Sequence, residues 1–218
     1  MILSDYIANV RTMIRDNNAA SYIFQDSEIQ SFIQAGVLFY SRYKARRRPY
    51  TLQLQPGVQQ YTLPSDWIRV DQESFNEAVG IKEVDLRQYV GFVLPSLNAV
   101  PSFSEMDFEF YDQDQLLMVS PAPGQSANLN FDYYAMHTIS STVCTVPVID
   151  SHAVTLASAS QALNTLAIDR GLKMQKYRVG QHLQIDDSEI AKRLQEQAQK
   201  YYDEFERLVR FRPFGVMG

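Results

Sequence analysis

Apolar residues recur every three or four positions in four segments of the chain, and this spacing is typical of amphipathic helices. The segments cover approximately residues 3–15, 27–43, 150–170 and 186–212. Gly36 interrupts the apolar stripe of the second segment, where glycine costs about 1 kcal/mol relative to alanine. We therefore expect another helix to cross closely at Gly36. Small residues between positions 153 and 162 of the third segment would also permit a close helix contact.

The ends of the third helix carry their own signals. Asp150 is a candidate N-cap, because an aspartate side chain can accept a hydrogen bond from a free amide of the first turn. Gly171 is a candidate C-cap, since glycine takes the left-handed conformation there without strain. The sequence thus predicts a helix between these two residues.

Between the second and third helices the pattern alternates with a period of two, as in half-exposed β-strands. Residues 50–54 and 58–63 flank Pro56-Gly57, which favours a type II turn, and we expect these two strands to form a hairpin. A second hairpin is expected from residues 108–111 and 116–119, and another strand over residues 129–133. The chain from 71 to 104 shows no pattern that we can interpret.

These periodicities predict an α+β fold, a helical bundle of about four helices with a β-rich antiparallel domain inserted between helices 2 and 3. We expect residues 1–49 and 150–211 to form the helical platform and residues 50–149 the inserted domain. Residues 212–218 form a C-terminal tail that is more apolar than a free terminus usually is.

Composition excludes several classes of protein. The chain has 218 residues, of which 45% are hydrophobic, a value typical of globular proteins. We expect a soluble cytosolic protein with no membrane contact, since no stretch approaches about 18 apolar residues and no secretory signal opens the chain. A net charge of −5 argues against a protein whose main function is to bind nucleic acid, because phosphate binding would require an excess of basic residues.

The residues that could perform chemistry show no catalytic arrangement. The single cysteine, Cys144, cannot form an internal disulfide, and the three histidines lack zinc-site spacing. There is no nucleophile elbow and no glycine-rich phosphate loop. The paired aspartates at 112/114 and 186/187 fit a turn and a helix N-terminus. We therefore expect no enzyme, no catalytic residues, no metal and no cofactor.

Three features could serve binding. A basic cluster, Lys44 with Arg46, Arg47 and Arg48, could contact DNA or a neighbouring subunit, or could be a solvated helix terminus. The only tryptophan, Trp67, could anchor an interface or join the hairpin to the helices in the core. The third feature is the apolar tail.

The order of these elements resembles the head-to-tail adaptor proteins of tailed bacteriophages, which include podovirus tail tubular protein A. In that family a Tyr-x-Leu-Pro-x-Asp-aromatic stretch closes the first hairpin. It is matched here by Tyr61, Leu63, Pro64, Asp66 and Trp67. The segment Ala162–Ala167, with the pattern Ala-Leu-x-x-Leu-Ala, is also similar to the family's closing helices.

The resemblance implies a structural subunit of the virion neck, made in the host cytoplasm. In such a protein about twelve copies form a ring beneath the portal, join the head to the tail and extend the DNA channel. The implied partners are other copies of the chain, the portal protein, a tail or nozzle protein, and genomic DNA that passes without specific binding. Twelve copies would carry a charge of about −60, which would keep DNA mobile.

On this reading the portal-binding residues lie at the end of the last helix and in the tail. They are Arg207, Arg210, Phe211, Arg212, Pro213, Phe214, Val216 and Met217. The alternative is a packaging accessory protein that binds nucleic acid through the Lys44–Arg48 cluster. A small hydrolase is a third hypothesis, which would require a polar pocket that encloses a perturbed acid, base or histidine.

Overall fold

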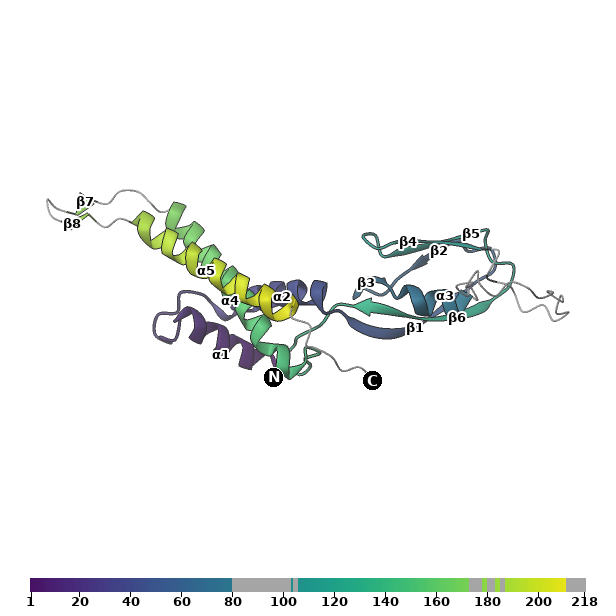
Figure 1. Cartoon of the computed structure of the whole chain (residues 1–218), viewed down its shortest axis with the longest axis horizontal. Coiled ribbons are helices and arrows are strands. Elements are labelled where there is room, and N and C mark those ends of the chain that lie inside the picture. The colour runs from purple at the N-terminus through teal and green to yellow at the C-terminus, as the bar shows by residue number, and fades with distance from the viewer. Residues whose placement is uncertain (80–102, 104–105, 173–177, 180–182, 185–186, 211–218) are drawn as a thin grey trace, which may run out of the picture. The chain divides into compact units, whose positions relative to one another are not determined.

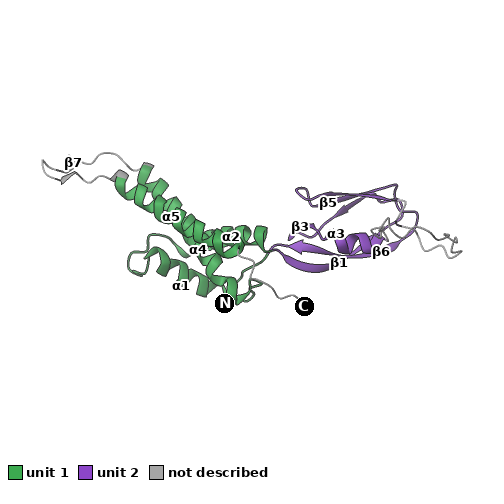
Figure 2. Ribbon diagram, viewed as in Figure 1, with its two compact units in different colours: residues 1–44, 137–218 green, residues 45–136 purple. Residues whose placement is uncertain are grey.

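The computed structural model describes residues 1–79, 103, 106–172, 178–179, 183–184 and 187–210 (Figure 1). The chain divides into two compact units, which are coloured separately in Figure 2. Unit 1 comprises Met1–Lys44 with His137–Gly218, and unit 2 comprises Ala45–Met136. Whether the domains fold independently with the boundaries expected from the sequence, at 49/50 and 149/150, stays a prediction.

Unit 1 is helical. Its helices are α1 (Leu3–Ile14), α2 (Asp26–Tyr43), the short 3-10 turn η2 (Val148–Asp150), α4 (Ser151–Leu172) and α5 (Asp187–Arg210). The two-residue strands β7 (Arg178–Val179) and β8 (Leu183–Gln184) pair between α4 and α5. All four helices occur where the apolar periodicity predicts them.

Helix α4 is the centre of unit 1. Every residue from Ala153 to Ser160 is buried, because α1, α2 and α5 all pack against this helix. The Ser160 hydroxyl donates a 2.8 Å hydrogen bond to the carbonyl of Ala198 on α5. The small side chains of α4 thus allow several helices to approach at once.

The close crossing expected at Gly36 is confirmed. A Cβ atom at Gly36 would lie 3.0 Å from the carbonyl oxygen of Val154 and closer still to the Ser158 hydroxyl. Both atoms belong to α4, so the absence of a side chain at Gly36 sets the distance between α2 and α4.

The predicted caps of α4 differ from the observed ones. Gly171 lies inside the helix, which continues to Leu172, so it does not end the helix in a left-handed conformation. The Asp150 side chain binds Tyr40 of α2 and Lys44, the C-cap residue of that helix. A tertiary contact has here replaced the local cap expected from the sequence.

Unit 2 contains two three-stranded antiparallel sheets and one helix. One sheet has the order β1 (Arg46–Leu54), β6 (Ala127–Ala135), β3 (Trp67–Val70). The other has the order β2 (Gln60–Thr62), β5 (Leu116–Ser120), β4 (Asp107–Tyr111). Helix α3 (Gln72–Val79) lies between residues 71 and 104, where the sequence pattern predicts no element.

The first predicted hairpin is wrong. The strand expected from Tyr50 begins at Arg46 and pairs with β6, whereas β2 pairs with β5. The turn itself is as expected, since Gly57 has a φ of 76° and the Val58 amide donates to the Gln55 carbonyl at 3.2 Å. A type II turn splays its flanking strands, and here it leads the chain from one sheet to the other. The second hairpin, β4 with β5, is confirmed.

Trp67 belongs to the aromatic core of unit 2. Its indole is 2% exposed and stacks on Tyr133 at 4.9 Å and on Phe110 at 5.6 Å, measured between ring centroids. Phe75 of α3 packs edge-on against Phe110 and Phe131. The expected burial of Trp67 in a core is therefore confirmed, with ring neighbours from β4 and β6, whereas its expected role in joining the hairpin to the helices stays a prediction. Together the two units confirm the α+β fold class.

The crossing predicts that Gly36→Ala destabilises the protein by about 1–3 kcal/mol, because the added methyl group must displace backbone atoms of α4. Gly124→Ala is the matched control, since a Cβ atom there would meet nothing within 4 Å. Urea denaturation of both variants measures the effect. Equal midpoints for the two variants would show that the Gly36 contact is not tight.

Candidate functional site

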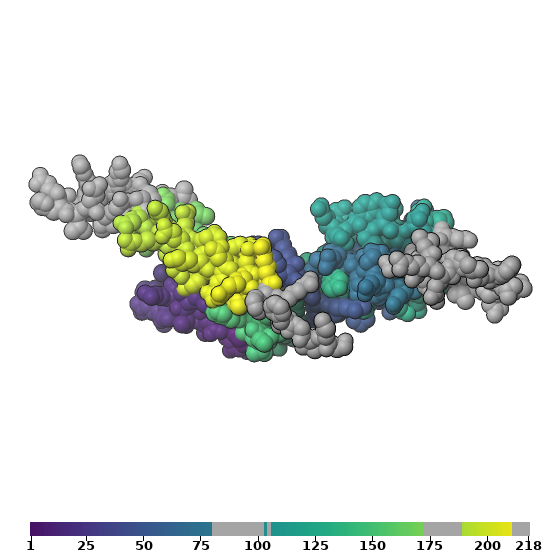
Figure 3. All heavy atoms as spheres, viewed as in Figure 1, coloured from purple at the N-terminus to yellow at the C-terminus, as the bar shows by residue number. Residues whose placement is uncertain are grey.

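The last turn of α5 carries two of the residues expected to bind the portal, Arg207 and Arg210. The side chain of Arg207 is 73% exposed and that of Arg210 is 63% exposed. Helix α5 runs along the visible face of unit 1 in Figure 3. The other expected portal-binding residues lie outside the described residues. They are Phe211, Arg212, Pro213, Phe214, Val216 and Met217.

The end of α5 is fixed to the end of α2. The Tyr43 hydroxyl donates to the Glu206 carboxylate at 3.1 Å, and the Arg210 guanidinium donates to the same oxygen at 3.1 Å. The Tyr43 ring also packs edge-on against Phe205, with 5.9 Å between centroids. These contacts hold the exposed arginines on a defined helix end, and the guanidinium groups stay accessible to an acidic partner.

A polar cluster lies at the same end of α2. The Asp150 carboxylate accepts hydrogen bonds from the Tyr40 hydroxyl at 2.6 Å and from the Lys44 ammonium at 2.9 Å. Burial alone would raise the pKa of Asp150, but these two bonds and the charges of Lys44 and His137 outweigh it and lower the pKa. Burial, and then the bond to Asp150, raise the pKa of Tyr40 well above its ordinary value. Lys44 of the basic cluster is thus already paired.

The arginines of the basic cluster lie on β1 in unit 2 and not on a helix terminus. Arg47 binds Asp71 at 2.8 Å and Asp132 at 2.7 Å through its Nε atom. The other two share Asp66, which lies 2.6 Å from Arg48 and 3.7 Å from Arg46. Three acids therefore neutralise the run, which leaves little unpaired positive charge for phosphate groups.

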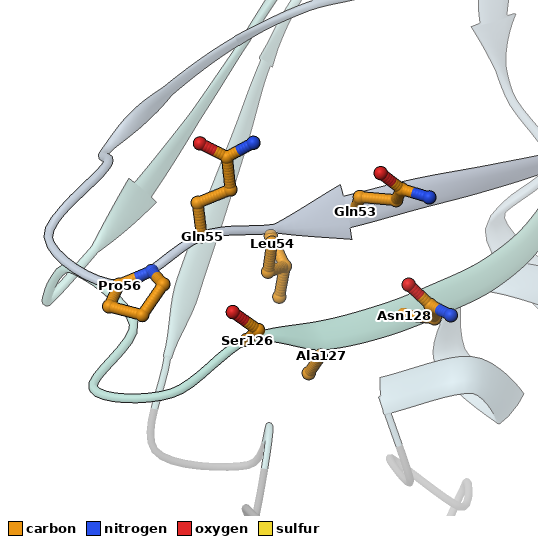
Figure 4. Close-up of a pocket in the computed structure, with 7 residues that line it drawn as sticks. All are labelled: Gln53, Leu54, Gln55, Pro56, Ser126, Ala127 and Asn128. Atoms are coloured by element: carbon orange, nitrogen blue, oxygen red, sulfur yellow. The ribbon is translucent and has the colours of Figure 1, made fainter.

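An open depression lies where β1 ends and β6 begins. It is lined by Gln53, Leu54, Gln55, Pro56, Ser126, Ala127 and Asn128. Figure 4 shows Gln53, Gln55, Ser126 and Asn128 pointing to one side of the strands, with Leu54 and Ala127 on the opposite side. This lining contains no titratable group. A second depression, between α1 and α4, includes His152 but no carboxylate.

Comparison with known proteins identifies the family. In the described part of the chain, no helix combines the length and the apolar character needed to cross a membrane. A comparison with curated proteins found no match. The sequence profile of the family described as SU10 adaptor protein matches residues 1–212. The chain belongs to this family. The family name indicates a bacteriophage adaptor, which is a structural component of the virion and a partner of portal and tail proteins.

The structure of this SU10 adaptor family member explains the motif that carried the sequence resemblance. The Tyr61 hydroxyl donates to the Val58 carbonyl at 3.0 Å and fixes the turn at Gly57. The Asp66 carboxylate accepts a hydrogen bond from the Tyr133 hydroxyl at 2.8 Å. Burial, and then this bond, raise the pKa of Tyr133 to about 12. The motif thus links β2, β3 and β6 in the core of unit 2.

Sequence reasoning missed the partners of the charged residues. Asp66, Asp71 and Asp132 were not recognised as the counter-charges of the arginine run, although their number matches the three arginines. The local sequence pattern around Asp150 indicates only a helix cap. The register that brings these acids to β1 depends on β6 and β3, and no local spacing reveals it.

The cluster around Asp150 predicts that Asp150→Asn lowers the free energy of unfolding by about 1–2 kcal/mol at neutral pH, because Tyr40 and Lys44 lose a charged acceptor. The lowered pKa means that the wild-type carboxylate stabilises the fold above its unfolded-state value of about 3.9 and loses this contribution as the pH falls further. Urea denaturation from about pH 7 to about pH 3 should therefore show the difference shrinking on acidification. Asp114→Asn, at an exposed turn position, is the control. A constant difference across this range would contradict the ionic role of Asp150.

Proposed function

We propose that this adaptor forms a ring, of about twelve copies, beneath the portal at the virion neck. The ring joins the phage head to the tail, meets the tail or nozzle protein on its other face, and extends the channel through which the genome is ejected. The observation that carries this proposal is the family membership over residues 1–212. The fixed, exposed arginines at the end of α5 support a docking role for that end.

The portal contact is assigned to Arg207 and Arg210 on α5, together with Phe211, Arg212, Pro213, Phe214, Val216 and Met217 of the following sequence. Guanidinium groups bind carboxylates with two parallel hydrogen bonds, and aromatic and methionine side chains are enriched at interfaces. A rigid helix end that carries the arginines reduces the ordering cost of docking. The apolar residues beyond it would then enter a hydrophobic part of the portal surface.

The Lys44–Arg48 cluster is better suited to structure or to a subunit contact than to DNA. Its charges are paired with Asp150, Asp66, Asp71 and Asp132. A phosphate would have to displace these carboxylates before it gained a contact. Genomic DNA is accordingly proposed to pass through the lumen without specific binding.

Deletion of residues 212–218 should leave a folded subunit that fails to join DNA-filled capsids. Charge reversal of both helix arginines, R207E/R210E, should weaken portal binding tenfold or more, because like charges then face the acidic partner. The matched control is R193E, since Arg193 is 74% exposed, lies on the same helix and pairs with Glu189 four residues earlier. Circular dichroism checks folding, and sedimentation with purified portal measures binding.

Normal capsid occupancy by the truncated protein would remove the tail from the portal contact. Equal binding by R207E/R210E and R193E would remove the helix arginines. Either result leaves the family membership intact and redirects the search to another surface of the ring.

The alternative packaging role makes a different prediction about salt. A protein that neutralises several phosphates loses affinity steeply as the salt concentration rises. The logarithm of the binding constant falls with the logarithm of the salt concentration, with a slope of about −0.9 per phosphate contact. The adaptor should show almost no binding to free duplex DNA in a filter assay, even at low salt. Tight binding that falls with salt and disappears in an R46A/R47A/R48A variant would favour the packaging role.

A further inference from the structure

His137 is the first residue of unit 1 after the chain returns from β6, and it is 8% exposed. Its backbone amide donates to the Ser41 hydroxyl oxygen at 2.9 Å, and that hydroxyl donates in turn to the Val37 carbonyl at 2.7 Å. Its ring packs against the Tyr40 ring, with 5.2 Å between centroids. The residue is therefore held from the backbone and from the ring face.

Both ring nitrogens of His137 face backbone carbonyl oxygens. Nε2 lies 2.9 Å from the oxygen of Lys44, and Nδ1 lies 2.9 Å from the oxygen of Thr145. A carbonyl oxygen can only accept a hydrogen bond, and a neutral imidazole has one N–H group to donate. Only the imidazolium, with a proton on each nitrogen, donates to both oxygens.

The Thr145 hydroxyl offers a neutral imidazole one other arrangement. Its oxygen lies 3.2 Å from Nδ1 and could donate to that nitrogen. The same hydroxyl donates a hydrogen bond to the Thr138 carbonyl oxygen at 3.3 Å, so this carbonyl competes with Nδ1 for the hydroxyl hydrogen. A neutral ring would still place the Nδ1 lone pair 2.9 Å from the Thr145 carbonyl oxygen, and this contact is repulsive. The geometry favours the cation.

A buried cation also requires a counter-charge. The charged and titratable groups around the ring include Tyr40 of α2, Lys44 at the C-cap of that helix, and Asp150 of η2. Asp150 interacts electrostatically with His137 and also with Tyr6 of α1. The Lys44 ammonium is positive but is bound to Asp150 at 2.9 Å. The Asp150 carboxylate is thus the counter-charge of both the Lys44 ammonium and the His137 imidazolium.

We propose that His137 is an imidazolium at neutral pH and acts as a pH-sensitive clasp between the residue at which the chain leaves unit 1 and the segment by which it returns. The His137 ring binds the carbonyl of Lys44, the last residue of unit 1 before the chain enters unit 2, and the carbonyl of Thr145, which follows His137 in unit 1. Loss of one proton breaks one of the two bonds and leaves the lone pair of that nitrogen facing the carbonyl oxygen, which is a repulsive contact, while the other bond remains. The connection is accordingly firm at neutral and acidic pH and loosens in alkali.

The protonation state can be read directly. A two-bond ¹H–¹⁵N correlation spectrum of the labelled full-length protein distinguishes a protonated ring nitrogen from a bare one. An ordinary histidine loses its proton near pH 6.5. At about pH 7.5 we expect two protonated nitrogens for His137. The variants H137Q and H152Q assign the signals, and the wild-type backbone amide of His137 assigns them if H137Q does not fold.

Stability supplies a second measurement. A proton held more tightly in the folded state stabilises the fold fully below the unfolded-state value near pH 6.5, and this contribution is lost as the pH rises. The unfolding constant should therefore increase by up to tenfold per pH unit above about pH 6.5 in the wild type and in H152Q. H137Q should lack this component of the slope.

A bare ring nitrogen on His137 at about pH 7.5 would overturn the proposal. An H137Q variant that folds and shows the wild-type pH slope would do the same. Two protonated nitrogens together with a slope lost only in H137Q would establish the clasp.

Discussion

The close approach of α2 to α4 at Gly36 is the constraint on which unit 1 depends. Helix α4 is buried from Ala153 to Ser160 because three helices pack around it. This close packing requires small side chains on α4 and the absence of a side chain at Gly36 of α2. Helix α5 packs along α4, so the same crossing fixes the position of the α5 terminus relative to α2. The contacts of Glu206 with Tyr43 and Arg210 depend on that placement.

The distribution of ion pairs separates structural charges from accessible ones. Lys44 and the arginines of β1 each have a carboxylate within the chain, and several of those acids are well shielded from water. Among the described residues, the carboxylates paired with Arg207 and Arg210 belong to glutamates of their own helix, at partly exposed positions. Exposed pairs of this kind contribute little to stability, and a partner can therefore replace them at small cost. The end of α5 is thus better suited to docking than the more strongly basic run.

The sequence predicted what depends on local periodicity and missed what depends on distant pairing. The four platform helices, the Gly36 crossing, the β4–β5 hairpin and the turn at Gly57 all follow from short-range patterns. The hairpin expected around that turn was wrong because β1 and β2 find partners, β6 and β5, more than fifty residues away. The acids that neutralise Arg47 lie on other elements for the same reason. The expected contacts of the tail after Arg210 stay a prediction about residues outside the described part.

The family gives the general role, a bacteriophage adaptor, and the end of α5 is the surface that we propose for its contact with the portal. Electron cryo-microscopy of the neck of the assembled particle tests the central claim most directly. The proposal predicts a closed ring of this subunit, about twelve copies, between the portal and the tail, with the end of α5 against the portal. A neck in which the portal contacts the tail without this subunit, or a ring whose α5 termini face away from the portal, would contradict it.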